Sequence, residues 1–297
     1  MSPGTANAAA PSGICPLCGG ASSRWLVKNA LPIQRCGACD NRFLAPADVP
    51  ADLESLYSTE YFVGGVATGY PTYQQDAPML ERNFAERVRR IGGWHAPGRV
   101  LDVGAAYGYF VKTAREAGWD ASGVELAPEV AREAAQLAQA EIVAGDFLQV
   151  PLVPGFDVIT MFDVIEHVRD PLAWLVHARE LLAPGGLLVI ETGDVASAWA
   201  RLLGRHWYFL DPPQHLWYFT GDGLEALLAR AGFRAPPQRW RSGRWVSLAN
   251  IAFKLVRLAP PSRLRSAVIE LARTKLGGSL YLRFGDTLLL AAVKGSA

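Results

Sequence analysis

Short apolar segments alternate with helical segments between residues 99 and 192, and this alternation constrains the fold more than any other feature of the chain. Strands are predicted over 99–103, 120–125, 141–144, 156–162 and 187–192, with helices over 109–117, 128–139 and 172–182 between them. A further helix is predicted over 223–231, and strands over 233–240 and 287–294. Strands that alternate with helices form parallel sheets covered by helices on both faces. We therefore expect an α/β fold with a doubly wound, mostly parallel sheet.

The first predicted strand runs into a glycine-rich turn, Asp102-Val103-Gly104-Ala105-Ala106-Tyr107-Gly108, and a helix follows. This order is the nucleotide-binding arrangement of doubly wound sheets. Gly104 allows a sharp turn, Gly108 allows the helix to pack close to the sheet, and Ala106 stands where a third glycine is commonest. Glu125 ends the second predicted strand, where a carboxylate can accept hydrogen bonds from both ribose hydroxyls of a nucleoside.

Asp102 indicates which nucleoside cofactor the turn accepts. An acidic side chain just before the first glycine repels a pyrophosphate and attracts an ammonium or a sulfonium. S-adenosylmethionine (SAM) carries both of these cations and no phosphate. The charge pattern therefore favours SAM over a dinucleotide.

Five motifs in the same order resemble those of class I SAM-dependent methyltransferases. They are Val100 to Gly108, Gly123-Val124-Glu125, Gly145-Asp146-Phe147, Phe156 to His167, and Leu182-Ala183-Pro184-Gly185-Gly186. The resemblance implies a Rossmann-like sheet of seven strands, with 287–294 as an antiparallel last strand, and an Asp146 that binds the adenine amine. It also implies the cofactor-binding residues Asp102, Gly104, Ala105, Ala106, Gly108, Tyr109, Phe110, Glu125, Leu126, Asp146, Phe147, Phe162, Asp163 and Val164.

Three residues are candidates for catalysis. Glu166 and His167 follow the fourth predicted strand, and His215 lies in a loop rich in proline and aromatic residues after the fifth. A general base accelerates proton removal by about 10²- to 10⁴-fold, and each of the three can act as one. The alternative is that Glu166 and His167 only organise the loop and the cofactor pocket.

All four cysteines lie in the first forty residues, as Cys15-x2-Cys18 and Cys36-x2-Cys39. Two such pairs place four thiolates tetrahedrally around zinc, so we expect a small zinc ribbon over 14–50. Four thiolates leave no open position for substrate, which makes the zinc structural. A pair of disulfides is the alternative.

The remaining segments complete the expected domain organisation. Residues 1–13 read as a disordered tail, 51–97 as an aromatic linker and helix, and 98–240 with 286–297 as the SAM-binding domain. Residues 241–285 read as a basic helical insert. Positions 230–285 hold 12 Lys or Arg against one Glu, although the chain has a net charge of +1. The insert could contact an anionic membrane surface, an acidic partner or a second copy of the chain, or could cover the sheet.

The leading functional hypothesis is a SAM-dependent methyltransferase that acts on the oxygen or carbon of a small molecule or glycan precursor. The cysteine pairs followed by an aromatic segment resemble bacterial methyltransferases with a zinc-binding head, some of which act on nucleotide-linked sugars, so a nucleotide- or lipid-linked sugar is one candidate acceptor. An RNA or other nucleic-acid methyltransferase that binds through the ribbon is the alternative, disfavoured by the acidic first 229 residues. A non-catalytic binding protein is the third hypothesis. Without a signal peptide or an apolar run of about 18 residues, we expect a cytoplasmic monomer or homodimer.

Overall fold

The computed structural model describes residues 13–52, 76–234, 238–248 and 279–295. The described residues form two compact units, one drawn from 1–56, 161–240 and 286–297 and the other from 57–160 and 241–285. We call them unit 1 and unit 2 and describe each by itself. The tail up to residue 12, positions 53–75 of the aromatic linker and positions 249–278 of the basic insert lie outside the described residues.

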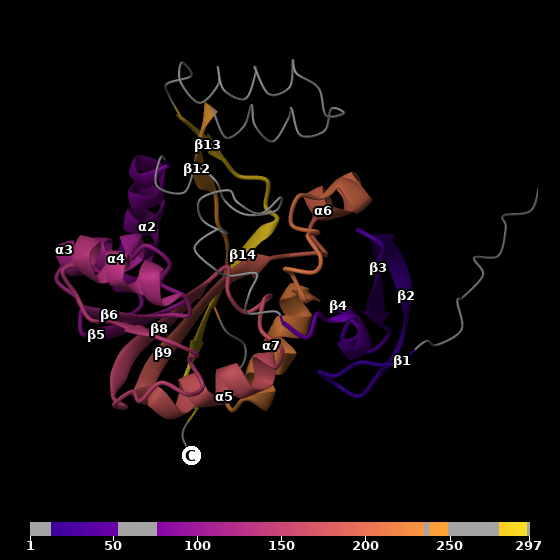
Figure 1. The fold of residues 1–297 in the computed structure, drawn as a ribbon, viewed down its shortest axis with the longest axis horizontal. Coiled ribbons are helices and arrows are strands. Elements are labelled where there is room, and N and C mark those ends of the chain that lie inside the picture. Colours follow the sequence, from indigo (N-terminus) through magenta and orange to yellow (C-terminus); the bar gives the residue numbers. More distant parts are fainter. Residues whose placement is uncertain (1–12, 53–75, 235–237, 249–278, 296–297) are drawn as a thin grey trace, which may run out of the picture. The chain divides into compact units, whose positions relative to one another are not determined.

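The main sheet has seven strands in the order β11-β14-β9-β8-β5-β6-β7 (Figure 1). Their bounds are β5 Arg99–Val103, β6 Asp120–Glu125, β7 Ile142–Ala144, β8 Phe156–Phe162, β9 Leu182–Gly193, β11 Gln238–Arg241 and β14 Thr287–Val293. β6 pairs in parallel with both β5 and β7. β14 pairs antiparallel with β9, with Leu290 opposite Ile190. The predicted Rossmann-like sheet, mostly parallel with an antiparallel last strand, is thereby confirmed.

Two strand boundaries differ from the prediction. β9 begins at Leu182 rather than Leu187, so the Pro-Gly-Gly turn predicted before the strand lies inside it, and a φ of 76° at Gly185 accommodates the turn. Within the strand predicted over 233–240, Phe233 makes an isolated bridge to Lys294 and β11 begins at Gln238. Positions 235–237 lie outside the described residues.

The described residues of unit 2 include the helices α2 Ala77–Gly92, α3 Tyr109–Glu116 and α4 Pro128–Ala138. α3 packs between α2 and α4. The two described ends of the expected helical insert are strands, β12 Arg244–Ser247 and β13 Ser279–Leu282, which pair antiparallel. Asn83 of α2 fastens this hairpin, because its side chain accepts a hydrogen bond from the Trp245 amide and donates one to the Trp245 carbonyl.

Unit 1 contains the helices α5 Pro171–Leu181, α6 Ala198–Leu203 and α7 Gly221–Arg230, with short 3-10 turns η1 Pro46–Asp48 and η3 Gly204–His206. It also holds a five-stranded sheet made of β1 Gly13–Ile14, β2 Ala21–Lys28, β3 Leu31–Cys36, β4 Arg42–Leu44 and β10 Trp217–Tyr218. β10 comes from the predicted aromatic loop and pairs antiparallel with β4, which places Trp217 opposite Phe43. The cysteine-rich segment and the aromatic loop therefore share one sheet.

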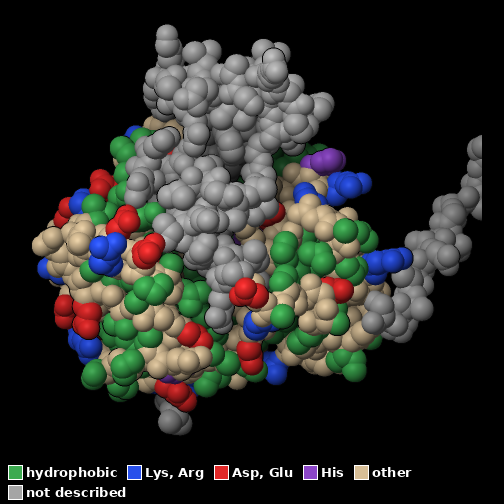
Figure 2. All heavy atoms as spheres, in the orientation of Figure 1, with side chains coloured by type: hydrophobic (Ala, Val, Ile, Leu, Met, Phe, Trp, Pro, Cys, Tyr) green, Lys and Arg blue, Asp and Glu red, His purple; other side chains and the backbone are tan. Residues whose placement is uncertain are grey.

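Among the described residues, none of the helices is long and apolar enough to cross a membrane. Figure 2 shows one face of the molecule, on which acidic and basic side chains are interspersed with apolar ones over the described surface.

Candidate functional site

The glycine-rich turn of unit 2 is a left-handed loop held against β6. The φ angles of Gly104, Ala106 and Gly108 are 75°, 46° and 78°. The amides of Gly104 and Ala105 both donate to the carbonyl of Val124, at 2.9 and 3.0 Å. Gly104 and Gly108 adopt these angles at no steric cost, whereas Ala106 adopts one that L-residues with a Cβ disfavour.

Glu125 explains how the loop holds this shape. Its two carboxylate oxygens accept from the amides of Ala106 at 2.8 Å and of Ala127 at 3.0 Å. Each of these oxygens can accept a second hydrogen bond, so the expected contact with ribose hydroxyls remains open to Glu125. Burial raises the pKa of the Glu125 carboxyl, and the backbone amides oppose that rise.

Asp102 lies on β5 beside this loop and is almost fully buried. Its Oδ1 accepts a hydrogen bond of 2.6 Å from the hydroxyl of Thr160 on β8. Burial raises the pKa of the Asp102 carboxyl from 3.8 to about 7; the Thr160 hydroxyl opposes the rise and the charge of Glu125 adds to it. At neutral pH the carboxyl is therefore poised between its neutral and its charged form, and a cation beside it would favour the charged form.

The other cofactor candidates of unit 2 surround the loop in different ways. Gly108 was expected to let the following helix pack close to the sheet. In the structure the close neighbour of Gly108 is α4, since a Cβ there would lie 3.0 Å from the carbonyl oxygen of Ala134. Tyr109 and Phe110 are buried at the start of α3, and Phe147 is buried in the turn after β7. Leu126 is half-buried. The Asp146 carboxylate accepts from the amide of Leu148, 3.0 Å away, and so closes its own turn.

In unit 1, the exit of β8 carries Asp163, Glu166 and His167. Asp163 has a φ of 53°, and its amide donates to the carbonyl of Glu191. Glu166 is fully buried, and its Oε2 accepts from the hydroxyl of Thr192 on β9 at 2.9 Å. The neighbouring cofactor candidates Phe162 and Val164 are half-buried at the same exit.

His167 and His215 lie together beside Glu166, with ring centroids 4.6 Å apart. One ligand atom from each of these three side chains lies within 4.8 Å of the other two. The three residues that the sequence suggested for catalysis, which span positions 166 to 215, are thus brought into one cluster by the fold. We call Glu166, His167 and His215 the Glu-His-His cluster.

Backbone carbonyls define the state of both imidazoles. Nδ1 of His167 lies 3.0 Å from the carbonyl oxygen of Gln214, and Nδ1 of His215 lies 2.6 Å from that of Phe209. A carbonyl oxygen can only accept, so each Nδ1 carries the proton and each Nε2 keeps its lone pair. Burial lowers the pKa of both imidazoles, and the proximity of His167 lowers that of His215 further.

The loop that carries His215 is held by the cysteine-rich sheet. Asn29 donates to the carbonyl of Pro212 at 2.7 Å, and the Leu44 amide donates to the carbonyl of Leu216 at 2.9 Å. From the other side, the backbone carbonyl of Glu166 accepts from the amide of Leu216. His215 is therefore positioned by contacts from both the N-terminal sheet and the Glu166 segment.

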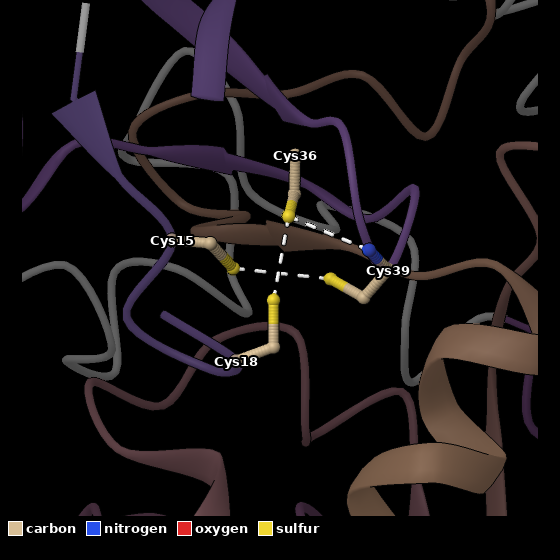
Figure 3. A group of neighbouring side chains, drawn as sticks. All are labelled: Cys15, Cys18, Cys36 and Cys39. Carbon is tan, nitrogen blue, oxygen red and sulfur yellow. Dashed lines mark hydrogen bonds between the residues drawn. The ribbon is translucent and has the colours of Figure 1, made fainter. Parts of the chain in front are cut away.

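The four cysteines form a compact group whose sulfurs point toward a common centre (Figure 3). Sγ of Cys15 lies 3.8 Å from that of Cys39, and Sγ of Cys18 lies 3.4 Å from that of Cys36. Sulfurs bound tetrahedrally to one zinc ion lie about 3.8 Å apart, so the group fits a metal ion. None of the four is in a disulfide, and the amides of Ala38 and Cys39 donate to Sγ of Cys36, as in metal knuckles.

Sequence reasoning missed the residues that support these groups. Thr160 holds Asp102, Thr192 holds Glu166, and Asn41 holds the start of α7 through its bond to the Thr220 amide. Thr160 and Thr192 did leave a signal, because each is a polar residue in a mostly apolar strand and a buried hydroxyl needs a partner. Asn41 left none, since its partner is 179 residues away.

Comparison with known proteins adds a family match and several relatives. Residues 74–236, more than half of the chain, match a family described as a methyltransferase domain. Over 146 residues the chain is 34% identical to a ubiquinone biosynthesis O-methyltransferase of Cereibacter sphaeroides, covering 45% of this chain and 59% of that protein. It is 31% identical over 144 residues to a malonyl-[acyl-carrier protein] O-methyltransferase of Serratia marcescens, covering 47% of this chain and 55% of that one. The chain thus spans less than two thirds of the length of these relatives.

Among solved structures, a SAM-dependent methyltransferase of Thermotoga maritima is similar in fold. It superposes with a TM-score of 0.53 at 19% sequence identity, over 82% of this chain and 99% of that one. At this identity the likeness concerns the fold alone.

Proposed function

The chain belongs to the methyltransferase-domain family of class I SAM-dependent methyltransferases, and we propose that it methylates a hydroxyl oxygen of a small molecule. The observation that carries the proposal is the Glu-His-His cluster at the exit of β8, with two neutral imidazoles whose Nε2 lone pairs can act on a hydroxyl proton. The names of the relatives from C. sphaeroides and S. marcescens, both O-methyltransferases, support the choice of oxygen.

The glycine-rich turn suits the cofactor of this family. Bound SAM supplies a methyl carbon activated by a sulfonium, and transfer to a hydroxyl leaves a neutral thioether and releases one proton. The pKa of Asp102 is about 7, so a cationic ligand beside it would stabilise the charged carboxylate. Each carboxylate oxygen of Glu125 can still accept a hydrogen bond from a ribose hydroxyl. Gly104, Ala105, Ala106 and Gly108 form the backbone against which such a nucleoside would rest. The other cofactor candidates, among them Asp146 and Asp163, stay proposals.

The acceptor hydroxyl must lose its proton, and this is what the Glu-His-His cluster supplies. Buried neutral imidazoles are poor cations, so His167 and His215 stay unprotonated at neutral pH and able to accept hydrogen bonds. Glu166 favours positive charge that develops beside it. We assign these three residues to the acceptor hydroxyl.

Two measurements test the proposal. SAM binding, followed by calorimetry on the purified chain, should be saturable and stoichiometric. Incubation of the protein and SAM with a panel of phenols, diphenols, hydroxy acids and nucleotide sugars should release S-adenosylhomocysteine with the phenolic or hydroxy-acid acceptors. Absence of SAM binding contradicts the methyltransferase activity, and release only with non-hydroxyl acceptors contradicts O-methylation.

A glycan precursor is the second candidate acceptor. The four-cysteine group, which lies outside the matched family segment of 74–236, favours it through the resemblance to methyltransferases with a zinc-binding head. Nucleotide sugars in the panel test it. Nucleic acid as an acceptor draws no support from the face in Figure 2, where both acidic and basic described side chains are exposed. Salt-sensitive retention on heparin would argue for it.

We also propose that the four cysteines bind a structural zinc ion. The sulfur spacing fits one ion, and the sheet that they fasten holds the loop of His215. A cytoplasmic location fits four reduced thiols, and it stays a prediction, as do the monomeric or dimeric state and the membrane contact of the basic insert.

A further inference from the structure

We propose that the Glu-His-His cluster is a second metal site, which binds a divalent transition-metal ion through one carboxylate oxygen of Glu166 and Nε2 of His167 and His215. The site is separate from the four cysteines and serves a different purpose. Two imidazoles and one carboxylate are a common set of protein ligands for such ions.

The spacing of the three side chains suits a shared ion. One ligand atom of each lies within 4.8 Å of the other two. Nitrogen and oxygen ligands lie about 2.1 Å from such an ion, so two ligands of one ion are about 3 to 4.2 Å apart. Small side-chain rotations that move the ligand atoms by a few tenths of an ångström therefore suffice to bring all three within bonding distance of one ion.

The contacts behind the ligands are those that metal-binding histidines need. A ligating histidine usually donates its other ring N–H to a carbonyl or carboxylate, which selects the tautomer and fixes the ring. His167 does so toward Gln214 and His215 toward Phe209. Thr192 does the equivalent for Glu166, by donating to Oε2. All three candidate ligands are thus held by neutral groups behind them, which fits ligands better than a lone general base.

The charge of the cluster also favours a cation. Glu166 is fully buried, and a buried carboxylate gains from a nearby positive charge. The Asp163 carboxylate lies close enough to act on His167 electrostatically. A divalent ion bound by Glu166 and the two neutral imidazoles would place such a positive charge beside the carboxylate.

Three protein ligands leave two or three coordination positions open on a five- or six-coordinate ion, and this suggests the class of acceptor. Resting here on the proposed O-methylation, we infer that the acceptor carries two adjacent oxygens, such as a vicinal diphenol, which chelate the ion together. The ion lowers the pKa of the bound hydroxyl, whose proton then leaves to solvent. Within this arrangement His167 and His215 act on the hydroxyl proton through the ion that their Nε2 lone pairs bind.

The decisive experiment measures manganese uptake independently of activity. The full chain is first given one equivalent of Zn²⁺. The four thiolates take it, because soft thiolate ligands select zinc, whereas a site with a carboxylate ligand also suits manganese. Mn²⁺ is then titrated in, and free Mn²⁺ is followed by electron paramagnetic resonance. We expect one further equivalent of Mn²⁺ to disappear from the free signal. A free signal equal to that of buffer at every step would overturn the proposal.

Two variants assign the ion to the cluster, and a third variant serves as the matched control. His215→Gln and His167→Gln should each lower the affinity for Mn²⁺ by tenfold or more, in line with the usual cost of disturbing a metal site. His206→Gln, which alters an exposed histidine of η3 in the same unit, should bind like the wild type. Wild-type uptake in His215→Gln would contradict the assignment. The wild-type titration needs no variant, so the proposal remains testable even where a variant fails to fold.

A vicinal diphenol and the matching monophenol then separate the metal site from the proposed function. The diphenol should change the spectrum of bound Mn²⁺, and the monophenol should not. Methyl transfer without manganese uptake overturns the metal site and leaves O-methylation standing. Manganese uptake without methyl transfer to any hydroxyl supports the site and contradicts the proposed function.

Discussion

Two buried carboxyl groups at the glycine-rich turn, those of Glu125 and Asp102, have different roles. Glu125 uses both oxygens to hold the backbone of Ala106 and Ala127, so it keeps the loop in shape before any ligand arrives. Asp102 has a hydroxyl partner in Thr160 and lies in a low-dielectric position. The first positions the loop, and the second is the residue that we propose as the electrostatic partner of a cationic ligand.

The Asp102 carboxyl predicts how SAM binding depends on pH. Its pKa, about 7 in the folded protein against an ordinary 3.8, means that the folded state holds more protons than the unfolded state between these values. The free energy of unfolding should therefore fall as pH rises from about 4 to about 7. SAM favours the charged form, so its affinity should rise as pH rises through 7. Calorimetry between pH 5.5 and 7.5 measures this.

Two variants isolate the contribution of Asp102. Asp102→Asn should remove the pH dependence, and comparison with it divides out the titration of the ligand itself. Thr160→Val keeps the side-chain shape and removes the hydrogen bond that lowers the Asp102 pKa, so its midpoint should move to higher pH. An identical pH profile in wild type and Asp102→Asn would show that another group is responsible.

Ala106 offers a second test on the same loop. It holds a φ of 46°, which costs an L-residue roughly 1–2 kcal/mol. Ala106→Gly should therefore raise the free energy of unfolding by about 0.5–1 kcal/mol, after the larger entropy of glycine in the unfolded chain is subtracted. The matched variant Ala105→Gly, at a buried position with negative φ, should instead lower it. Denaturant unfolding compares them, and equal effects would contradict the strain at Ala106.

Among the secondary-structure elements, prediction succeeded where a periodic signal was present. β5, β6, β8 and the helices beside them follow from apolar runs and helical spacing. The three strands have the expected bounds, and the ends of the helices differ from expectation by at most one residue. β10 could not be foreseen. It is two residues long, its partner β4 lies about 170 positions earlier, and both segments are aromatic and irregular. No local preference encodes such a pairing, because it depends on the packing of Trp217 against Phe43.

Asn41 joins the cysteine-rich segment to a helix, and its removal should be costly. Its Oδ1 accepts from the amide of Thr220, the N-cap residue of α7, and Asn41 is buried. Asn41→Ala should lower the free energy of unfolding by about 1–3 kcal/mol, because a buried amide loses its acceptor. Asn41→Asp keeps an acceptor oxygen next to the helix N-terminus and should be milder. Thermal unfolding would contradict this if the two variants were equally destabilised.

For the molecule as a whole, the sequence suggested the residues of both candidate sites. It did not predict that the sheet of the cysteine-rich segment holds the loop of His215. The glycine-rich turn is a local motif, and its neighbours along the chain define it. The Glu-His-His cluster depends on a loop that returns from 48 residues away, and its histidines are oriented by the carbonyls of Gln214 and Phe209. Side-chain types can be read from a sequence, whereas carbonyl directions require the fold.

The contact between the cysteine-rich sheet and the loop of His215 leads to a prediction about each unit. The cysteines fasten the sheet that holds the loop of His215 within unit 1, whereas the glycine-rich turn belongs to unit 2. Cys18→Ser removes one of the four proposed zinc ligands, so it should loosen that loop and raise the KM for the acceptor by roughly tenfold, equivalent to about 1.4 kcal/mol. The dissociation constant of SAM should stay unchanged. Val27→Thr, on an exposed position of β2, is the control and should alter neither constant. If Cys18→Ser weakened SAM binding as much as acceptor binding, the cysteines would instead support the whole fold, and their proposed role in holding the acceptor loop would be wrong.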